Sequence, residues 1–131
     1  MADDLNRQRM LQFLDAFYAG DTEAATACCD AELDSITYAP IELFPHLGHK
    51  HGNAWIAEAI WTQQQRYSNR TYELKFMAVH GDKIAIMLFA SLRKHNDDRV
   101  VHLEIADFFT LRAGLILVHR SFFDTFDFVQ Q

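Results

Sequence analysis

Hydrophobic positions in the first half of the chain recur at the spacing of amphipathic helices. Residues 5–18 place leucine, methionine, phenylalanine and tyrosine side chains on one face of a predicted helix. Gly20 ends this helix, and Asp21 can cap a second, short helix over residues 22–29. A third helix is predicted over residues 53–66, where it begins at a capping asparagine.

The second half of the chain has the pattern of strands joined by polar turns. Strands are predicted over residues 34–39, 70–79, 83–94, 99–111 and 115–126. Residues 41–52, rich in Pro, Gly and His, are expected to form a loop. Residues 112–114 are expected to form a type I turn with Gly114 in the left-handed conformation. This order predicts an α+β domain whose helices cover one face of a curved antiparallel sheet.

The composition narrows the range of functions. A chain of 131 residues, 50% of them hydrophobic, can form one domain with a core and an internal apolar pocket. The net charge of −6 argues against nucleic acid or an anionic membrane as a partner. No apolar run is long enough to span a bilayer, and the N-terminal residues lack the order of a secretion signal. Because neighbouring cysteines such as Cys28 and Cys29 rarely bridge, we expect reduced thiols and a cytoplasmic location.

Three segments carry a resemblance to a known family. They are "FLDAFYAGDTEAATACCDAEL", "HGNAWIAEAI" and "LRAGLILVHRSFFD". In this order they resemble the nuclear-transport-factor-2-like superfamily, which includes ketosteroid isomerases, limonene-epoxide hydrolases and SnoaL-like polyketide cyclases. The resemblance implies one α+β domain over residues 1–131, with three N-terminal helices packed on the concave face of a cone-shaped, mixed or antiparallel sheet. Because this fold hosts both enzymes and non-enzymes, it does not by itself assign a function.

The residues that the resemblance would make functional are only partly present. Positions that are polar in the isomerases or epoxide hydrolases are apolar here: Phe13, Ala39, Leu88 and Ala90. Asp107 matches the protonated Asp of the isomerases, and Asp124 matches an Asp at the end of the last strand of the hydrolases. SnoaL-like cyclases are similar in relying on an acid/base Asp in this terminal region. The resemblance therefore makes Asp124 the leading catalytic candidate.

The geometry of a hairpin suggests a partner for each of these two carboxylates. If the last two strands pair symmetrically about residues 112–114, Asp107 lies opposite His119 and His102 lies opposite Asp124. This register gives one His–Asp pair on each face of the sheet, and either face could be the internal one. We take His102 and Asp124 as the catalytic pair, because a carboxylate beside an imidazole in an apolar wall can exchange protons near neutral pH. The alternative is a structural salt bridge at the rim of the sheet, from Arg120 to Glu104 or to Asp124.

Further candidates follow from the strand and helix faces. The residues expected to contact a substrate are Tyr38, Trp55, Asp107, His119, Arg120 and Phe122. Three histidines in "PHLGHKHG", His46, His49 and His51, could ligate a metal, but their spacing fits a loop at the mouth of the pocket better. We therefore predict neither a metal site nor a cofactor.

Two functions remain open from the sequence. The first is a cofactor-independent acid/base enzyme, a cyclase, isomerase or hydrolase, acting on a small and largely apolar substrate. The second is a non-catalytic domain that binds a small ligand or acts as a dimeric interaction module. In both cases we expect a homodimer, because both faces of the last hairpin are rich in Phe, Leu and Ile and helices can cover only one of them.

Overall fold

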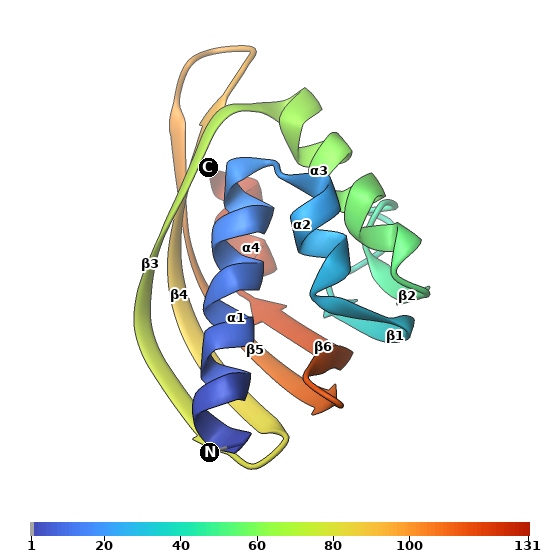
Figure 1. Ribbon diagram of the computed structural model, residues 1–131. Coiled ribbons are helices and arrows are strands. Elements are labelled where there is room, and N and C mark those ends of the chain that lie inside the picture. The colour runs from blue at the N-terminus through green and yellow to red at the C-terminus, as the bar shows by residue number, and fades with distance from the viewer. Residues whose placement is uncertain (1) are drawn as a thin grey trace.

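A computed structural model describes residues 2–131 of the chain. The elements are α1 (Ala2–Ala19), α2 (Thr22–Ala27), β1 (Cys29–Tyr38), β2 (Gly48–His51), α3 (Ala54–Arg66), β3 (Tyr67–His80), β4 (Lys83–Lys94), β5 (Val100–Arg112), β6 (Leu115–Phe123) and α4 (Thr125–Gln130). The predicted α+β class is confirmed, and α1, α2 and α3 lie inside the curve of the sheet (Figure 1). Within the described residues, none of the helices combines the length and hydropathy needed to cross a lipid bilayer.

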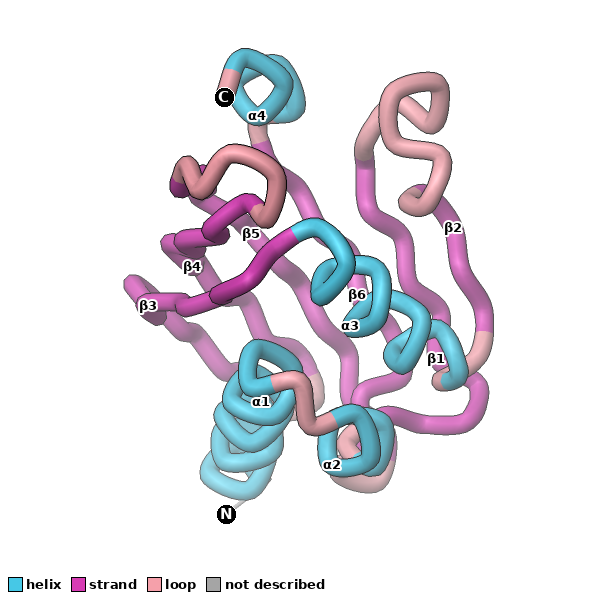
Figure 2. The backbone as a smooth tube through the Cα atoms, turned by 90° about the horizontal axis from the view of Figure 1, so that it is seen from above, coloured by secondary structure: helices cyan, strands magenta, loops and turns pink. Residues whose placement is uncertain are grey.

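The sheet has six strands in the order β2-β1-β6-β5-β4-β3. β1 and β6 run parallel to each other, and every other neighbouring pair is antiparallel, so the sheet is mixed. Figure 2 shows α4 on the same side of the molecule as the loop between β1 and β2. Phe44 from that loop packs against Phe128 of α4, with ring centroids 5.5 Å apart. The two segments therefore close one end of the space between the helices and the sheet.

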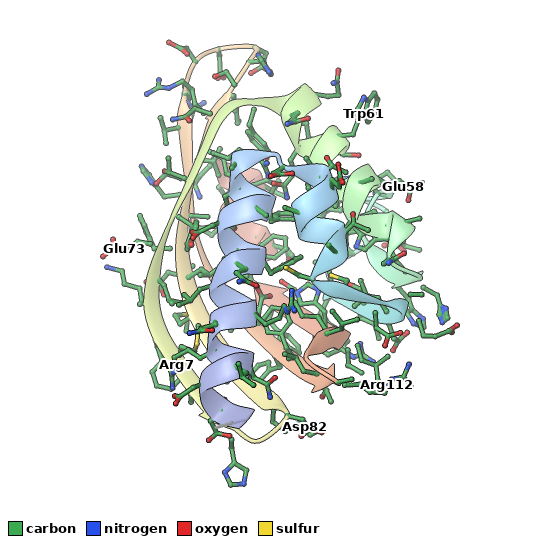
Figure 3. The ribbon with its side chains drawn as sticks, viewed as in Figure 1. Arg7, Glu58, Trp61, Glu73, Asp82 and Arg112 are labelled. Carbon is green, nitrogen blue, oxygen red and sulfur yellow. The ribbon has the colours of Figure 1, made fainter. Side chains whose placement is uncertain are left out.

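The core lies between the helices and the concave face of the sheet. Every second residue of β4 from Ile84 to Leu92 is buried, as expected when one face of a strand packs on helices. Met10 on α1 is completely buried. On α3, Ile60 faces inward, whereas Trp61 points away from the sheet and is 63% exposed (Figure 3).

Several predicted boundaries are wrong. β1 begins at Cys29, so the second helix is shorter and the first strand longer than predicted. The predicted loop over 41–52 contains the short strand β2, which pairs with β1. The last strand ends at Phe123, and the residues after it form α4. Both missed elements are short and owe their conformation to neighbouring segments rather than to a periodicity of their own.

The register of the last hairpin also differs from the prediction. The turn has two residues, Ala113 and Gly114, with φ of 51° and 76°, as in a type I′ turn rather than the predicted type I turn. A bulge follows, because Leu111 pairs with Ile116 whereas Thr110 pairs with Val118.

The consequence of turn and bulge together is a register shift of two residues near the middle of the hairpin. Asp107 lies opposite Ser121, and not opposite His119 as predicted. An even shift leaves each side chain on its predicted face, because the side-chain period of a strand is two. Asp107 and His119 therefore still share the concave face.

Candidate active site

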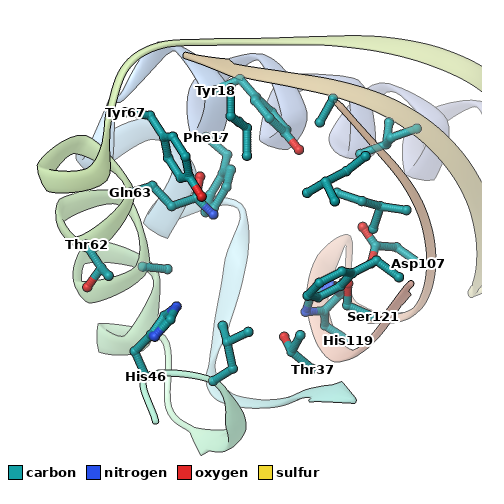
Figure 4. Close-up of a pocket in the computed structure, with 18 of the residues that line it drawn as sticks. Phe17, Tyr18, Thr37, His46, Thr62, Gln63, Tyr67, Asp107, His119 and Ser121 are labelled. Carbon is teal, nitrogen blue, oxygen red and sulfur yellow. Dashed lines mark hydrogen bonds and ion pairs between the residues drawn. The ribbon is translucent and has the colours of Figure 1, made fainter. Parts of the chain in front are cut away.

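A cavity of about 180 Å³ lies between α1, α3 and the concave face of the sheet. Its walls are mainly apolar side chains from the helices and the central strands, including Phe17, Leu88, Leu103 and Ile105. A few polar side chains project into it, as Figure 4 shows. A mostly apolar cavity with few polar groups is the usual form of a small-molecule site.

Three polar side chains form a hydrogen-bonded chain in one wall of this cavity. Oδ1 of Asp107 lies 3.3 Å from Nε2 of His119, and Nδ1 of the same imidazole lies 2.9 Å from Oγ of Ser35. Asp107 and Ser35 are buried, with 7% and 2% of their surfaces exposed. The imidazole stacks on Phe109, with ring centroids 4.9 Å apart. Both ring nitrogens are thus engaged, which fixes the orientation of the imidazole.

Alternation along three adjacent strands brings this chain together. Ser35 lies opposite His119 across the parallel β1–β6 pair. Asp107 lies opposite Ser121 on the antiparallel side of β6, so it reaches the imidazole diagonally. A buried carboxylate is costly unless it is hydrogen-bonded or paired. Within residues 2–131, the ion pair of Asp107 is with His119.

Two tyrosines add hydroxyl groups that the sequence reasoning did not assign to the site. The phenols of Tyr18 on α1 and Tyr67 at the start of β3 extend into the cavity (Figure 4). Burial raises the pKa of Tyr18 far above its usual value, and the charge of Asp107 raises it further. Burial also raises the pKa of Tyr67. Both phenols therefore stay protonated near neutral pH and can donate hydrogen bonds.

Tyr18 escaped notice because its position fits two readings. It continues the apolar face of the first predicted helix, so periodicity assigns it to the core. The resemblance directed attention to Phe13, which has no donor. A tyrosine on a buried face needs a partner for its hydroxyl, and that requirement was the available signal.

The other end of the cavity carries basic and amide groups. His46, Thr62, Gln63 and Arg66 contribute to the lining there. Nη2 of Arg66 lies 3.4 Å from Nδ1 of His46. Partial burial lowers the pKa of His46, and the charges of Arg66 and Lys50 lower it further. The imidazole is therefore neutral near pH 7.

A family model described as the SnoaL-like domain matches residues 10–119. The chain belongs to the SnoaL-like domain family. The resemblance inferred from the three sequence segments is thereby confirmed. No curated protein sequence matches the chain.

Solved structures share the whole fold of this SnoaL-like domain. An NTF2-like protein of unknown function from Burkholderia pseudomallei has 16% identity and a TM-score of 0.86, with 96% of this chain and 95% of that chain covered. TerC, co-crystallised with polyporic acid, has 17% identity and a TM-score of 0.85, with 96% of each chain covered. An LEH-like epoxide hydrolase from M. tuberculosis has 16% identity and a TM-score of 0.79, with 99% and 90% covered. At these identities the likeness establishes the fold alone.

The predicted pairing of His102 with Asp124 is wrong in this SnoaL-like domain. Asp124 stands outside the strand, exposed, and its Oδ1 accepts a hydrogen bond from the backbone N–H of Asp127 at 3.0 Å. It is the N-cap of α4. His102 lies on the outer face of the sheet, where its ring stacks on Phe89. Nδ1 of His102 lies 3.1 Å from Oγ of Ser91. Neither residue lines the cavity.

The residues predicted to bind substrate divide between the two faces. Trp55, Asp107 and His119 line the cavity. Tyr38 and Phe122 stack on each other on the outer face, with centroids 4.6 Å apart and both exposed. Arg120 is also on that face, and its guanidinium lies 2.7 Å from Oδ2 of Asp34. The placement of these last three in the pocket is therefore wrong, because the pocket lies on the other side of the sheet.

The three loop histidines do not converge. His49 contacts Asp34, and His51 lies 3.5 Å from Glu32, both on the exposed side of β2. His46 alone lines the cavity. Over residues 2–131, no group of three His, Cys, Asp or Glu side chains is placed to hold a metal ion.

Proposed function

We propose that this SnoaL-like domain is a cofactor-independent acid/base enzyme that acts on a small, largely apolar carbonyl compound. The observation that carries the proposal is the chain from Asp107 through His119 to Ser35 in the wall of an apolar cavity. A general base needs a proton acceptor that is held in place and reachable by the substrate. Asp107 meets both conditions, because His119 holds one carboxylate oxygen and the side chain borders the cavity.

The proposed step is the removal of a proton from a carbon next to the carbonyl. The carboxylate of Asp107 accepts the proton, the C–H electron pair forms the C=C bond of an enolate, and the carbonyl electron pair moves to the oxygen. Returning the proton to another carbon completes an isomerisation. Attack of the enolate carbon on a second carbonyl, whose oxygen takes the proton from Asp107, completes a cyclisation. Neither route needs an oxidant or a reductant.

Tyr18 is the proposed donor to the substrate oxygen. Its phenol faces the cavity, and it lies close enough to Asp107 for that charge to raise the pKa of Tyr18. A hydrogen bond to an oxygen that becomes negative is stronger in the transition state than in the ground state. Tyr18 would thus do the work for which the resemblance offered only Phe13.

We assign to His119 the role of holding the Asp107 carboxylate in position to accept a proton. With the carboxylate ionised, Nε2–H of His119 donates to Asp107 and the hydroxyl of Ser35 donates to Nδ1. When Asp107 has taken the proton, its other oxygen can still accept from Nε2–H, so the imidazole holds the carboxyl group in place through the reaction. An isolated buried carboxylate would lack this support.

A second function, binding of a small ligand without catalysis, also has a specific observation in its favour. Four positions that are polar in catalytic relatives are apolar here, and three of them, Phe13, Leu88 and Ala90, line the cavity. Such a cavity would bind a ligand without reacting with it. TerC, a structural neighbour, was crystallised with polyporic acid. That neighbour supports a small-molecule occupant for either function.

Deuterium exchange distinguishes the two functions without knowledge of the natural substrate. A panel of cyclic ketones and 1,3-diketones is incubated with the protein in D₂O, and loss of the proton signal next to the carbonyl is followed by NMR. We expect accelerated exchange for members that bind, and a loss of about a hundredfold or more in Asp107→Asn. Asp124→Asn is the matched control and should exchange at the wild-type rate.

Two results would contradict the enzyme proposal. One is exchange in Asp107→Asn at the wild-type rate, in protein whose circular dichroism shows the native fold. The other is binding of panel members to the wild-type protein with no exchange above the buffer rate. The second result would favour the binding domain.

We also propose that the protein is a homodimer that associates through the outer face of the sheet. Four large side chains on that face are substantially exposed: Tyr38, Phe76, Phe108 and Phe122. Phe108 and Phe122 contact each other, with ring centroids 5.9 Å apart, and the stacked pair with Tyr38 continues the patch onto β1. A monomer that left such an aromatic patch in water would be unusual.

A further inference from the structure

The cavity has two chemically different ends. Asp107, His119, Ser121 and Thr37 project from the strands at one end, and His46 projects from the loop before β2 at the other (Figure 4). Arg66, the last residue of α3, lines the same end as His46 and is exposed. Apolar walls separate the two ends. A ligand that fills the cavity is therefore in contact with an acidic group at one end and basic groups at the other.

The basic end has no acidic partner of its own. In the described part of the chain, neither Arg66 nor Lys50 forms an ion pair with a carboxylate, whereas seven other basic side chains do. The contact of Arg66 is with the ring of His46, and that of Lys50 is with Trp55, whose ring centroid lies 5.2 Å from Nζ. Two unpaired cations beside one cavity are notable in a protein with a net charge of −6.

The hydrogen bond between Arg66 and His46 also fixes which nitrogen of the imidazole carries a proton. A guanidinium can only donate, so Nδ1 of His46 must accept, and the proton of the neutral ring is on Nε2. Nε2–H is then free to donate to a ligand. Arg66 and His46 together offer N–H groups from two directions at the mouth of the cavity.

We propose that Arg66 and His46 recognise an anionic oxygen group on the ligand, in the simplest case a carboxylate, so that the preferred ligand is a small apolar acid. This inference rests on the proposed function for the position of the reacting carbon but not for the binding of the anion. The carboxylate of Asp107 repels an anion placed deep in the cavity. The ligand therefore enters with its apolar body toward Asp107 and leaves its charged group at the mouth.

The surroundings of the mouth set the strength of this recognition. A groove on the outside of α3 adjoins it and is lined by His46, Lys50, Trp55, Glu58 and Trp61, among others. Glu58 is exposed and points away from the sheet, so solvent screens its repulsion of a bound anion (Figure 3). Lys50 is half-buried and adds a second positive charge. Because Arg66 is also exposed, its contribution is moderate rather than large.

A matched pair of ligands tests the inference. 3-Phenylpropanoate and 3-phenylpropanamide have the same skeleton and nearly the same shape, and only the first is charged at neutral pH. Each is titrated into ¹⁵N-labelled protein, and the backbone amide shifts report both the dissociation constant and the location. We expect the acid to bind about three- to tenfold more tightly than the amide, with shifts in α3, β5 and β6.

Three variants locate the source of the preference. Arg66→Gln should remove the preference for the acid while leaving the affinity for the amide within about twofold of wild type. Arg66→Lys should keep part of the preference for the acid, because the charge remains although the bidentate geometry of the guanidinium is lost. Arg7→Gln is the control, because it removes the same charge from an exposed position on the far part of α1, and it should keep the full preference (Figure 3).

Several outcomes would overturn the inference. The wild-type protein could bind the acid and the amide with equal affinity, or Arg66→Gln could weaken the binding of both ligands equally. Arg7→Gln could lose the preference for the acid, or neither ligand could shift the amide signals at the cavity. The proposed function fails separately. Asp107→Asn should keep or increase the preference for the acid while it loses deuterium exchange. A wild-type protein that prefers the acid but catalyses no exchange would refute the enzyme and leave the anion site standing.

Discussion

Ser35 offers a direct test of the hydrogen-bonded chain, because its hydroxyl does nothing visible except hold His119. Oγ lies 2.9 Å from Nδ1 of the imidazole, and only 2% of the residue is exposed. In Ser35→Ala no water can easily replace the hydroxyl, so Nδ1 is left without a partner. Such a loss costs about 1–3 kcal/mol of unfolding free energy. In a domain of this size that corresponds to about 4 °C in melting temperature per kcal/mol.

The same change should alter the chemistry in a way that a merely structural defect would not. Without Ser35 the imidazole can exchange between its two tautomers, and only one of them donates from Nε2 to Asp107. We expect the ¹⁵N shifts of His119 to move toward a mixture of tautomers. Deuterium exchange of a bound ketone should fall by roughly ten- to a hundredfold, the range seen when the hydrogen-bond partner of a metal-ligating histidine is removed.

Ser121→Ala is the matched control for this prediction. Ser121 is also buried and belongs to the neighbouring strand, but its hydroxyl faces the cavity. Removing it should cost about 0.5 kcal/mol or less and leave the tautomer of His119 unchanged. Urea denaturation of both variants measures the difference. If Ser35→Ala loses no more stability than Ser121→Ala and keeps the wild-type ¹⁵N shifts, the chain is not organised as we describe.

Two further predictions concern the parts of the molecule outside the cavity. Asp124→Ala should destabilise α4 by about 1 kcal/mol, which would be seen as faster amide exchange from Asp127 onward. Asp124→Asn keeps a capping side chain and should change the exchange little. Equal effects of the two variants would argue against the cap. Phe108→Glu should convert the homodimer into a monomer of 15.2 kDa, as measured by sedimentation. Phe126→Glu should leave the homodimer intact, because Phe126 is also exposed but lies on α4. A wild-type protein that is already a monomer at micromolar concentration would refute the dimer.

The parts of the fold that could be predicted from sequence are those with a strong period of their own. The bounds of β4 agree with the predicted strand over 83–94, because alternation there is regular over its whole length. The start of α3 after Asn53 was also predicted correctly, although the side chain of Asn53 makes no capping hydrogen bond. The assignment of side chains to the two faces of β5 and β6 survived an error in register, since that error was an even number of residues.

The errors arise where neighbouring segments decide the conformation. Ala113 adopts a φ of 51°, which an alanine seldom does, so nothing in the sequence indicated a type I′ turn. The bulge that follows the turn has no signature of its own either, and the two together displaced the predicted pairs. The even shift kept Asp107 and His119 on one face, but the sequence did not show which face was concave, and the catalytic pair was placed on the outer one.

Asp124 was misread for a different reason, because a local signal was present and was not used. An Asp three residues before Asp127 has the spacing of a helix N-cap, with an acidic residue in the first turn of the helix. The aromatic residues around it suggested a strand, and the strand reading hid the cap. The resemblance reinforced the error by matching Asp124 to a catalytic Asp of relatives.

The surroundings of Asp124 and Asp107 indicate which of these two carboxylates has a structural role and which is a candidate for function. Asp124 is exposed and stabilises the start of a helix, so its presence among phenylalanines needs no other explanation. Asp107 is 7% exposed in an apolar wall, and a buried ion pair such as the one that it forms with His119 is weak evidence for a role in stability. An ionisable group that is held in an apolar wall where a ligand can reach it is the better candidate for chemistry. The same reasoning applies to both ends of the cavity. Asp107 and Arg66 line it at positions where they can contact a ligand, so we expect them to serve reaction and binding rather than folding.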